Sequence, residues 1–486
     1  MIRIFSNVES IRYSAYHIIK AFFQDEDAAQ ENSLPPGSQE DLSGREYLCV
    51  YRDEQILLCS ADKLDKHETD ILLYDTLKKL TGRELPWGVL TGVRPVKLAM
   101  EQLDKQSRSG FIEHFRKERR VGKRKAGLAY DIAVRERRLI RSVLQGKDRD
   151  LGSFSIYVGI PICPSICSYC SFSSGLLSVW KDRLDEYIDA LTGELAQAAG
   201  WLKDLSLTSI YIGGGTPTVL TEKQMERLLG CLRDNYHAEK TAEYTLEAGR
   251  PDTITKEKLE LAKSYGVSRL SINPQSMQQK TLDLVGRRHS TGQIVEAFEL
   301  ARELGFDNIN MDVIAGLPGE TARDMADTIS RISVLRPENL TVHALAVKRA
   351  AALGSLKTDS RVIDEMIDTA AKGAETMGMY PYYMYRQKSI AGNHENTGYA
   401  IPGRECIYNV MIMEEVQSIF AFGAGATTKI LLKEKVQNPD RAKGVMTDML
   451  RQDNVSSIAD YISRWREMAE TKEKTFDIGK VPCYYT

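Results

Sequence analysis

Short apolar runs and longer amphipathic stretches alternate along the chain between about residues 155 and 347. The short runs are rich in Val, Ile, Tyr, Thr and Leu, residues that favour strands. We expect strands at Ser155–Ile160, Ser209–Gly213, Tyr244–Glu247, Arg269–Ile272, Ile309–Ile314 and Thr341–Leu345. In the stretch 182–202, Leu184, Ile188, Leu191 and Leu195 follow the spacing of a helix with one apolar face. Similar patterns predict helices at Lys223–Leu232, Lys256–Ala262, Ile294–Leu304 and Thr321–Leu335.

Strand and helix patterns that alternate in this way indicate repeated βα units and therefore a parallel sheet. The predicted fold class is α/β, with a partial (β/α)6 barrel, a small N-terminal α/β domain and a C-terminal extension. The predicted domain boundaries are 1–150, 151–350 and 351–486. In the first domain we expect strands at Met1–Phe5, Tyr47–Arg52 and Gln55–Cys59, helices near Tyr13–Phe23, Thr69–Leu80 and Lys97–Leu103, and an exposed loop at Asp25–Ser43.

The C-terminal third is predicted to be mostly helical. Helices are expected at Asp359–Gly378 and Glu414–Phe422, and Lys433–Thr486 has the pattern of polar helices and a tail. Two interpretations remain for Tyr380, Tyr382, Tyr383 and Tyr385, which either pack a core or surface or wall a large flat substrate. Lys348, Arg386 and Lys388 are candidates for contacts with carboxylates, and a surface role is equally natural for each.

Composition and charge narrow the class of protein. The chain has 486 residues, 42% of them hydrophobic, and a formal net charge of −2, so no overall bias toward nucleic acid or anionic membranes exists. No run of eighteen apolar residues occurs, and the first residues lack the apolar core of a signal peptide. We therefore expect a cytoplasmic protein without a membrane span.

Basic residues crowd the stretch from Arg116 to Arg141. Because Glu118, Asp131 and Glu136 interrupt the run, solvated helix faces are favoured over a patch that binds RNA or another anion. The stretch also lacks the interleaved aromatic residues that are typical of single-strand binding. We therefore do not expect nucleic acid as a partner.

Cys163, Cys167 and Cys170 stand in the spacing CxxxCxxC at the end of an expected strand. Structural zinc needs four closed ligands, and no fourth cysteine or histidine lies close in the sequence. A disulfide framework or mere packing also fits this triplet poorly. Three thiolates would leave one iron of a [4Fe-4S] cluster open to a small molecule. Packing or surface thiols are the expectation for the scattered Cys49, Cys59, Cys231, Cys406 and Cys483.

Further polar motifs lie where the expected strands end. They are Gly213-Gly-Gly-Thr-Pro-Thr218, Glu247, Asn273-Pro-Gln-Ser276, and Asp312 with the turn Gly316-Leu-Pro-Gly319. Ligands of parallel sheets bind at the carboxyl ends of the strands, so these motifs and the cysteines should share one face. Glycines without side chains let the backbone approach a ligand closely. Any one of these motifs is weak evidence by itself, and their combination predicts a ligand site.

With these motifs the chain resembles the radical S-adenosylmethionine (SAM) enzymes from about Tyr157 to Lys429. Within them it is similar to the oxygen-independent coproporphyrinogen III dehydrogenases and their relatives, the heme chaperones. The N-terminal extension, Tyr382-Tyr-Met-Tyr-Arg-Gln-Lys388 and Gly392-Asn-His-Glu-Asn396 resemble the Gram-positive coproporphyrinogen-dehydrogenase-like branch. Other strings that carry the resemblance are Glu247-Ala-Gly-Arg-Pro-Asp-Thr253, Arg269-Leu-Ser-Ile-Asn-Pro-Gln-Ser276, Leu284-Val-Gly-Arg-Arg-His289, Asp312-Val-Ile-Ala-Gly-Leu-Pro-Gly319 and Phe422-Gly-Ala-Gly-Ala426.

The resemblance implies a [4Fe-4S] cluster on Cys163, Cys167 and Cys170, and a SAM molecule on its open iron. It also implies which residues line the SAM site. These are Tyr157, Tyr169, Gly214, Gly215, Thr216, Glu247, Gln275, Arg287, Asp312 and Ala346. Glu247 and Asp312 can accept from ribose hydroxyls or an amine, and Arg287 can pair with a carboxylate.

The resemblance further implies oxidative decarboxylation of the propionates of coproporphyrinogen III to vinyl groups, with a flavodoxin- or ferredoxin-type electron donor. A heme chaperone is the second candidate. The chaperones carry a His-Asn-x-x-Tyr-Trp signature where this chain has Tyr408-Asn-Val-Met-Ile-Met413, so only Met411, Met413 or His394 remain as ligands for heme iron. A different radical reaction on a tetrapyrrole, such as anaerobic heme opening, is a third candidate function, and RNA modification is a fourth.

Overall fold

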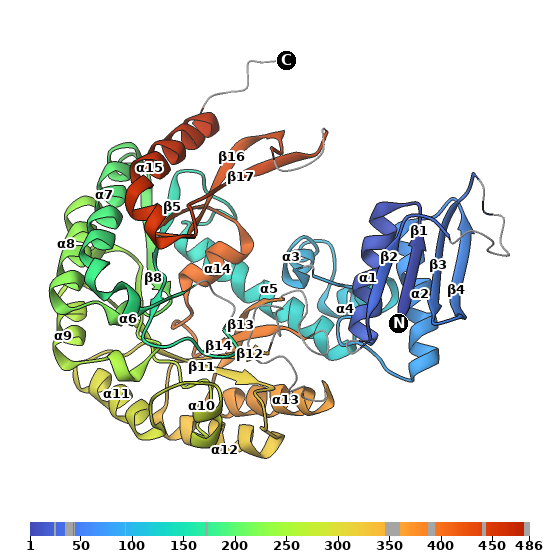
Figure 1. The fold of residues 1–486 in the computed structure, drawn as a ribbon, viewed down its shortest axis with the longest axis horizontal. Helices are drawn as coiled ribbons and strands as arrows, with labels where there is room; N and C mark the ends of the chain where they lie inside the picture. The colour runs from blue at the N-terminus through green and yellow to red at the C-terminus, as the bar shows by residue number, and fades with distance from the viewer. Residues whose placement is uncertain are drawn as a thin grey trace.

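A curved sheet that carries helices on its outer face dominates the computed structural model (Figure 1). The structure describes residues 1–23, 26–34, 42, 44–92, 94–170, 174–345, 360–386, 394–439 and 444–480. Six neighbouring strands of the curved sheet run parallel to one another. They are β5 (Ser153–Ile160), β8 (Ser206–Gly214), β9 (Glu243–Glu247), β10 (Arg269–Ser271), β11 (Ile309–Ala315) and β12 (Asn339–Ala344). The predicted α/β fold is therefore confirmed.

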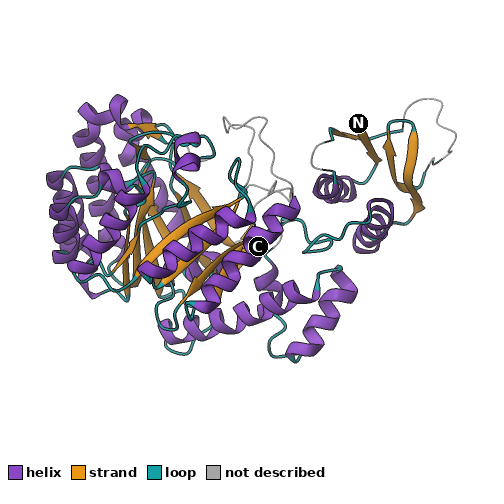
Figure 2. Ribbon diagram, turned by 90° about the horizontal axis from the view of Figure 1, so that it is seen from below, coloured by secondary structure: helices purple, strands orange, loops and turns teal. Residues whose placement is uncertain are grey.

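Helices connect these strands and cover the outer face of the sheet (Figures 1 and 2). They are α6 (Leu177–Trp180), α7 (Leu184–Leu202), α8 (Glu222–Tyr236), α9 (Lys256–Ser264), α10 (Gln279–Leu284), α11 (Thr291–Glu303), α12 (Ala322–Leu335) and α13 (Ser360–Thr376). The apolar stripe predicted for α7 is buried, with Leu184, Ile188, Leu191 and Leu195 in the core between helices and sheet. Capping boxes begin α8, α11 and α12 at Thr221, Ser290 and Thr321.

The curved sheet continues beyond the six parallel strands at both ends and stays open in the described part of the chain. At one end, β14 (Asn396–Ala400) and β13 (Tyr380–Tyr385) are antiparallel additions beside β12. At the other end, β15 (Ser418–Phe422) lies parallel to β5, followed by the hairpin β16 (Thr427–Gln437) and β17 (Met446–Asp453). The helices α14 (Ile407–Glu414) and α15 (Ile458–Lys480) complete this region.

Two predictions for the C-terminal region were wrong. The expected helix Glu414–Phe422 is the end of α14 followed by β15, because Glu415 adopts a left-handed φ of 56° that ends the helix. A short apolar run such as Ser418–Phe422 cannot be told from a helix by periodicity alone. Lys433–Thr486 contains the end of β16 and all of β17 as well as α15, while 481–486 lie outside the described residues.

The N-terminal part contains a separate four-stranded sheet in the order β2-β1-β3-β4. Its strands are β1 (Ile2–Ser6), β2 (Ala28–Glu31), β3 (Glu46–Arg52) and β4 (Gln55–Asp62), and its helices are α1 (Glu9–Phe22) and α2 (Lys66–Thr81). Ile2 and Ile4 pack against these helices, whereas Phe5 packs on the opposite face with Tyr47 and Cys49. The predicted loop Asp25–Ser43 was wrong for β2, which is held by parallel pairing with β1 despite its weak strand propensity. Residues 25, 35–41 and 43 of this predicted loop lie outside the described residues.

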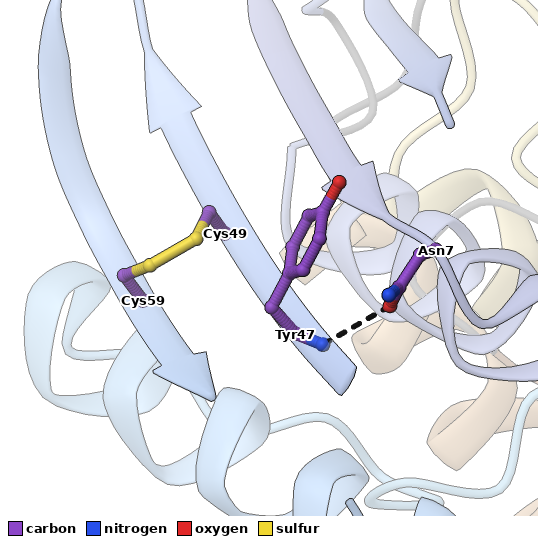
Figure 3. Close-up of a disulfide and its surroundings, with 4 residues drawn as sticks. All are labelled: Asn7, Tyr47, Cys49 and Cys59. Atoms are coloured by element: carbon purple, nitrogen blue, oxygen red, sulfur yellow. Dashed lines mark hydrogen bonds between the residues drawn. A yellow bond between two sulfur atoms is a disulfide. The ribbon is translucent and has the colours of Figure 1, made fainter. Parts of the chain in front are cut away.

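A disulfide joins Cys49 to Cys59 across β3 and β4 (Figure 3). The two residues are direct partners in the antiparallel register, ten positions apart in the sequence. The expectation of free thiols was therefore wrong for this pair, because only the hairpin register brings the two sulfurs together. Cys231 and Cys406 are free, as expected.

The helices α3 (Pro95–Met100), α4 (Arg108–Arg119) and α5 (Lys123–Val143) connect the two sheets. Most basic residues of the stretch 116–141 form ion pairs here, and all of these pairs except the buried Lys125–Glu395 are partly exposed, as solvated faces are. The pairs are Arg116–Glu113, Arg120–Asp75, Arg124–Asp368, Lys125–Glu395, Arg137–Asp104 and Arg141–Asp148. The division into domains at residues 150 and 350 stays a prediction. Within the described residues, no helix is long and apolar enough to cross a membrane.

Candidate active site at the carboxyl edge of the parallel strands

The cysteine loop follows β5. Cys163 ends the short strand β6 (Ile162–Cys163), which pairs with β7 (Gly175–Leu176), and Cys167 and Cys170 come after it. None of the three thiols is joined in a disulfide, and all three are partly exposed. The loop is anchored to the turn that follows α10, because Ser165 Oγ donates to Gly286 O at 3.1 Å and Ser168 N donates to Val285 O at 3.0 Å. The segment Val285–Gly286, far away in the sequence, therefore holds the cysteine loop.

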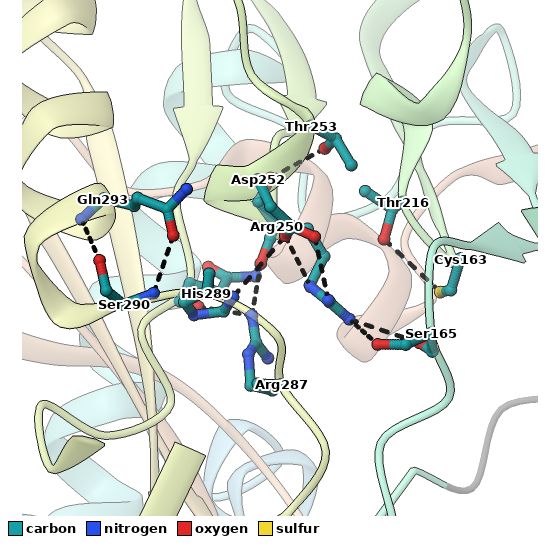
Figure 4. Close-up of polar contacts among 12 residues, drawn as sticks. Cys163, Ser165, Thr216, Arg250, Asp252, Thr253, Arg287, His289, Ser290 and Gln293 are labelled. Atoms are coloured by element: carbon teal, nitrogen blue, oxygen red, sulfur yellow. Dashed lines mark hydrogen bonds and ion pairs between the residues drawn. The ribbon is translucent and has the colours of Figure 1, made fainter. Parts of the chain in front are cut away.

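The glycines at the end of β8 lie against this loop. A Cβ on Gly215 would stand 2.6 Å from Ile162 O and 2.9 Å from Cys163 Sγ, so only glycine lets the two segments pack this closely. Thr216, which is buried, donates its backbone N–H to Ile162 O at 2.9 Å. Its hydroxyl points to Cys163 Sγ at 3.5 Å (Figure 4). The Gly-rich motif thus shapes the surroundings of the first cysteine.

Glu247, at the end of β9, faces three tyrosines. Tyr211 donates its hydroxyl to Glu247 Oε1 at 2.5 Å. The Tyr211 ring stacks on Tyr157 and on Tyr408, with ring centroids 6.3 Å and 4.8 Å away. Burial raises the pKa of Glu247 to about 7, and the nearby Asp312 adds to this shift while the bond from Tyr211 opposes it. Glu247 is therefore poised to change protonation near neutral pH.

Asp312 on β11 behaves in the opposite way. Burial alone would raise its pKa, but His343 and hydrogen bonds from Asn310 and Thr341 lower the pKa below its usual value. Asn310 Nδ2 donates to Asp312 Oδ1 at 2.7 Å, and His343 Nε2 lies 3.7 Å from Oδ2. The other ring nitrogen of His343 lies 3.2 Å from the hydroxyl of Tyr385. Asp312 thus remains an ionised acceptor beside Glu247.

Gln275 follows β10 and has a left-handed backbone φ of 64°. Residues other than glycine and asparagine rarely adopt this backbone conformation. Its N–H donates to Asp312 O at 2.8 Å, and its carbonyl accepts from Ile314 N at 2.9 Å. These two bonds place Gln275 next to Asp312. Strained backbone of this kind clusters at functional sites.

Arg287 is buried beside the cysteine loop and touches no carboxylate within ion-pair distance among the described residues. Its Nη1 donates to the hydroxyl of Tyr169 at 2.8 Å, and its Nη2 donates to Gly249 O and Asn273 O at 2.6 and 2.8 Å. Nε has no partner in the described part of the protein. A buried guanidinium with an open donor is suited to an incoming carboxylate.

Comparisons with known proteins agree with this arrangement. The family model of the radical SAM superfamily matches residues 157–332. The oxygen-independent coproporphyrinogen-III oxidase-like protein HemZ of Bacillus subtilis is 39% identical over 76% of this chain and 75% of its own length. The chain belongs to this oxidase-like family of radical SAM proteins. The heme chaperone HemW of B. subtilis is 32% identical over 56% of this chain and 70% of its own length.

The fold of this radical SAM protein also matches a solved structure. Coproporphyrinogen III oxidase HemN from Escherichia coli, described as a radical SAM enzyme, aligns with a TM-score of 0.53 at 22% identity. The alignment covers 69% of this chain and 73% of that chain. The likeness supports the α/β fold with a parallel core.

As a member of this family, the protein is an enzyme that uses a [4Fe-4S] cluster and SAM. The donors fit the cluster, because three thiols lie on one loop while a fourth ligand is absent from it. In the described part of the chain, no three His, Cys, Asp or Glu side chains gather around a point where a single metal ion would sit. The assignment of individual residues to the cluster and to SAM remains a prediction.

Not every candidate was brought to this edge. Ala346, Lys348 and Lys388 lie outside the described residues. Tyr382 and Tyr383 are core residues, in agreement with the packing interpretation. Arg386 donates to Leu90 O at 2.6 Å, so it links strand β13 to the N-terminal part.

Sequence reasoning missed several residues that contact the site. Tyr211 could have been found, because it pairs in register with Tyr157 on the neighbouring strand and points the same way. Arg250 is part of the motif Glu247-Ala-Gly-Arg-Pro-Asp-Thr253, but the sequence predicted no function for it. His343 could have been found in a similar way, because it lies two positions after Thr341, the register partner of Asp312. Tyr385 was a candidate only as a wall for a flat substrate, and no signal in the sequence would have placed Tyr408 beside Tyr211, because it comes from a distant element.

Proposed function

We propose that this protein catalyses the oxygen-independent oxidative decarboxylation of coproporphyrinogen III. In this proposal, two propionate side chains become vinyl groups and protoporphyrinogen IX forms. The observation that carries the proposal is the 39% identity to HemZ over three quarters of both chains. The polar residues gathered at the carboxyl edge of the parallel strands support it further.

The residues have distinct proposed tasks. Cys163, Cys167 and Cys170 hold the cluster, and Tyr157, Tyr169, Gly214, Gly215, Thr216 and Gln275 line the space for SAM. The cluster and SAM, when bound, supply a 5′-deoxyadenosyl radical that takes a hydrogen atom. Asp312 and ionised Glu247 accept hydrogen bonds from the ribose hydroxyls or the amine of SAM. Arg287 pairs with the carboxylate of SAM.

For the substrate, the hydrogen atom is taken from the carbon β to the carboxylate of a propionate. Carbon dioxide leaves, one further electron passes to a one-electron acceptor, and the vinyl double bond remains. The chain's part is to orient the propionate and exclude water. A flavodoxin- or ferredoxin-type protein is the proposed donor of the electron that begins the cycle.

Anaerobic turnover of the reconstituted protein tests this proposal. The protein is incubated with SAM, a reductant and coproporphyrinogen III, and 5′-deoxyadenosine and porphyrins are followed by mass spectrometry. Loss of two carboxyl groups per substrate is the expected result. Formation of 5′-deoxyadenosine without decarboxylation would overturn the substrate and keep the radical chemistry.

A heme chaperone is the second candidate, because HemW is 32% identical over 70% of its length. The segment that corresponds to the chaperone signature forms α14, whose Met411 is fully buried. His394 is also buried and faces Asp364 at 3.2 Å. Heme ligation by either residue would require rearrangement. Stoichiometric heme binding, together with no 5′-deoxyadenosine from a protein with an intact cluster, would favour the chaperone.

A further inference from the structure

Arg250 is a buried cation that reaches the cysteine loop from the end of β9. Its side chain is 4% exposed, and the residue directly precedes the turn Pro251–Thr253. Two of its nitrogens bind Asp252, with Nε 3.0 Å from Oδ1 and Nη2 3.2 Å from Oδ2. This bidentate pair fixes the plane of the guanidinium and leaves Nη1 for a different partner.

The third nitrogen, Nη1, points at the cysteine loop (Figure 4). It lies 3.0 Å from Ser165 Oγ, 3.3 Å from Ser165 O and 4.0 Å from Cys167 Sγ. Ser165 is itself tied to Gly286 O. Both the guanidinium and the loop that faces it are therefore held in place, so the N–H group is aimed at one particular cysteine.

The carboxylate that orients Arg250 lies beside a buried histidine. His289, which is buried, places its Nδ1 3.7 Å from Asp252 Oδ1. Burial alone would raise the pKa of Asp252, but His289 and Arg250 lower it to about 2. Asp252 therefore stays ionised and balances the charge of Arg250. Arg250 therefore acts on Cys167 through a directed N–H group and not through a large net charge.

Hydrogen bonds to the sulfurs and local charge are two of the factors that set the reduction potential of an iron–sulfur cluster. An N–H group aimed at a thiolate stabilises the reduced, more negative cluster more than the oxidised one. We propose that Arg250 makes the cluster easier to reduce by donating from Nη1 to the thiolate of Cys167. Arg250 is thus a positioning and tuning residue, with Asp252 as its support. The inference rests on the proposed cluster site at the three cysteines.

Redox titration followed by electron paramagnetic resonance tests this role on the reconstituted full-length protein, without any tetrapyrrole. The variants are R250Q, R250K and R250Q/D252N, each checked for iron and sulfide content. R250Q/D252N removes both charges and so preserves the net charge. We expect the equilibrium constant for reduction of its cluster to be at least tenfold smaller than in the wild type. For one electron, this corresponds to a reduction potential that is lower by at least 59 mV. R250Q should shift further, because Asp252 is then left unbalanced.

R233Q is the matched control, because Arg233 also pairs with a neighbouring aspartate, at 2.8 Å from Asp234, on the exposed surface of α8. Its potential should equal that of the wild type. An unchanged potential in R250Q/D252N with a full cluster would overturn the role of Arg250. If that variant holds little iron, R250Q decides instead, and a wild-type potential there would overturn the role. A wild-type protein that forms no cluster would overturn the cluster site itself.

Discussion

The two sheets of this protein differ in where they place the ends of their strands. In the curved sheet, six parallel neighbours end at the same edge, so the loops after β5, β8, β9, β10 and β11 meet there. In the N-terminal sheet, β1 and β3 as well as β3 and β4 are antiparallel, so the loops are divided between opposite edges. A parallel sheet collects polar groups from distant parts of the sequence, whereas this mixed sheet does not.

The two sheets also differ in the polar groups that they bury. At the edge of the curved sheet, Arg250 and Arg287 are buried and donate to groups of the cysteine loop. In the N-terminal part, buried Asp70 has its partners, Ser14 and Lys66, on the two helices α1 and α2. Its cysteines are consumed by the Cys49–Cys59 disulfide. This difference predicts that the curved sheet carries the catalytic residues, whereas the N-terminal sheet contributes only to the stability of the protein.

Among the substitutions that test this difference between the sheets, Cys167→Ser in the curved sheet should have the largest effect. Serine does not replace a thiolate as a ligand of iron, so we expect loss of the cluster and of all detectable 5′-deoxyadenosine. Iron content and visible absorbance measure the first effect, and mass spectrometry the second. Cys231→Ser, at a free thiol on α8, is the control and should keep both. Retention of the cluster in C167S would contradict the proposed ligand set.

Gly215→Ala should give the next largest effect. The added Cβ would stand 2.6 Å from Ile162 O, so the cysteine loop must shift, at a cost of about 1–3 kcal/mol. We expect several-fold less bound iron and a lower melting temperature. Gly200→Ala is the matched control, because nothing lies within 4 Å of its added Cβ in helix α7. Equal iron contents in the two variants would show that the close packing at Gly215 is unimportant.

Glu247→Gln tests whether SAM binding at the curved sheet depends on pH. With a pKa of about 7, Glu247 ionises between pH 6 and 8, so the proposed SAM affinity should rise about tenfold over this range. The glutamine variant should lack this dependence, and equilibrium dialysis at several pH values measures it. Because the folded pKa lies above the unfolded value of about 4.3, the stabilising effect of this proton is lost as the pH rises toward 7. A pH-independent affinity in the wild type would contradict the proposed contact.

Replacing both Cys49 and Cys59 by Ser should affect catalysis least. A disulfide that closes a loop of ten residues stabilises by about 2–3 kcal/mol in the chain-entropy model. We expect a lower unfolding midpoint for the N-terminal sheet and an unchanged cluster. Reductant should lower the midpoint of the wild type to that of the variant. Loss of 5′-deoxyadenosine formation in the variant would show that the N-terminal sheet contributes to the chemistry.

The elements of the curved sheet could be predicted because their signals are local. Each strand is a short β-rich run, and each helix has a stripe such as Leu184, Ile188, Leu191 and Leu195. The prediction failed at Ala28–Glu31 and Ser418–Phe422, where pairing with β1 and with β5 decides the structure. Strand pairing is a tertiary interaction, and propensity does not contain it.

By itself, the sequence determined the α/β class, the cysteine triplet and the set of motifs at the strand ends. These features depend on residue type and spacing, which are present in the unfolded chain. Only the tertiary structure decided that Arg250 points at Cys167, that Tyr408 stacks on Tyr211 and that Cys49 meets Cys59. Contacts between residues distant in the sequence arise from strand order, register and loop packing, and no local pattern specifies them.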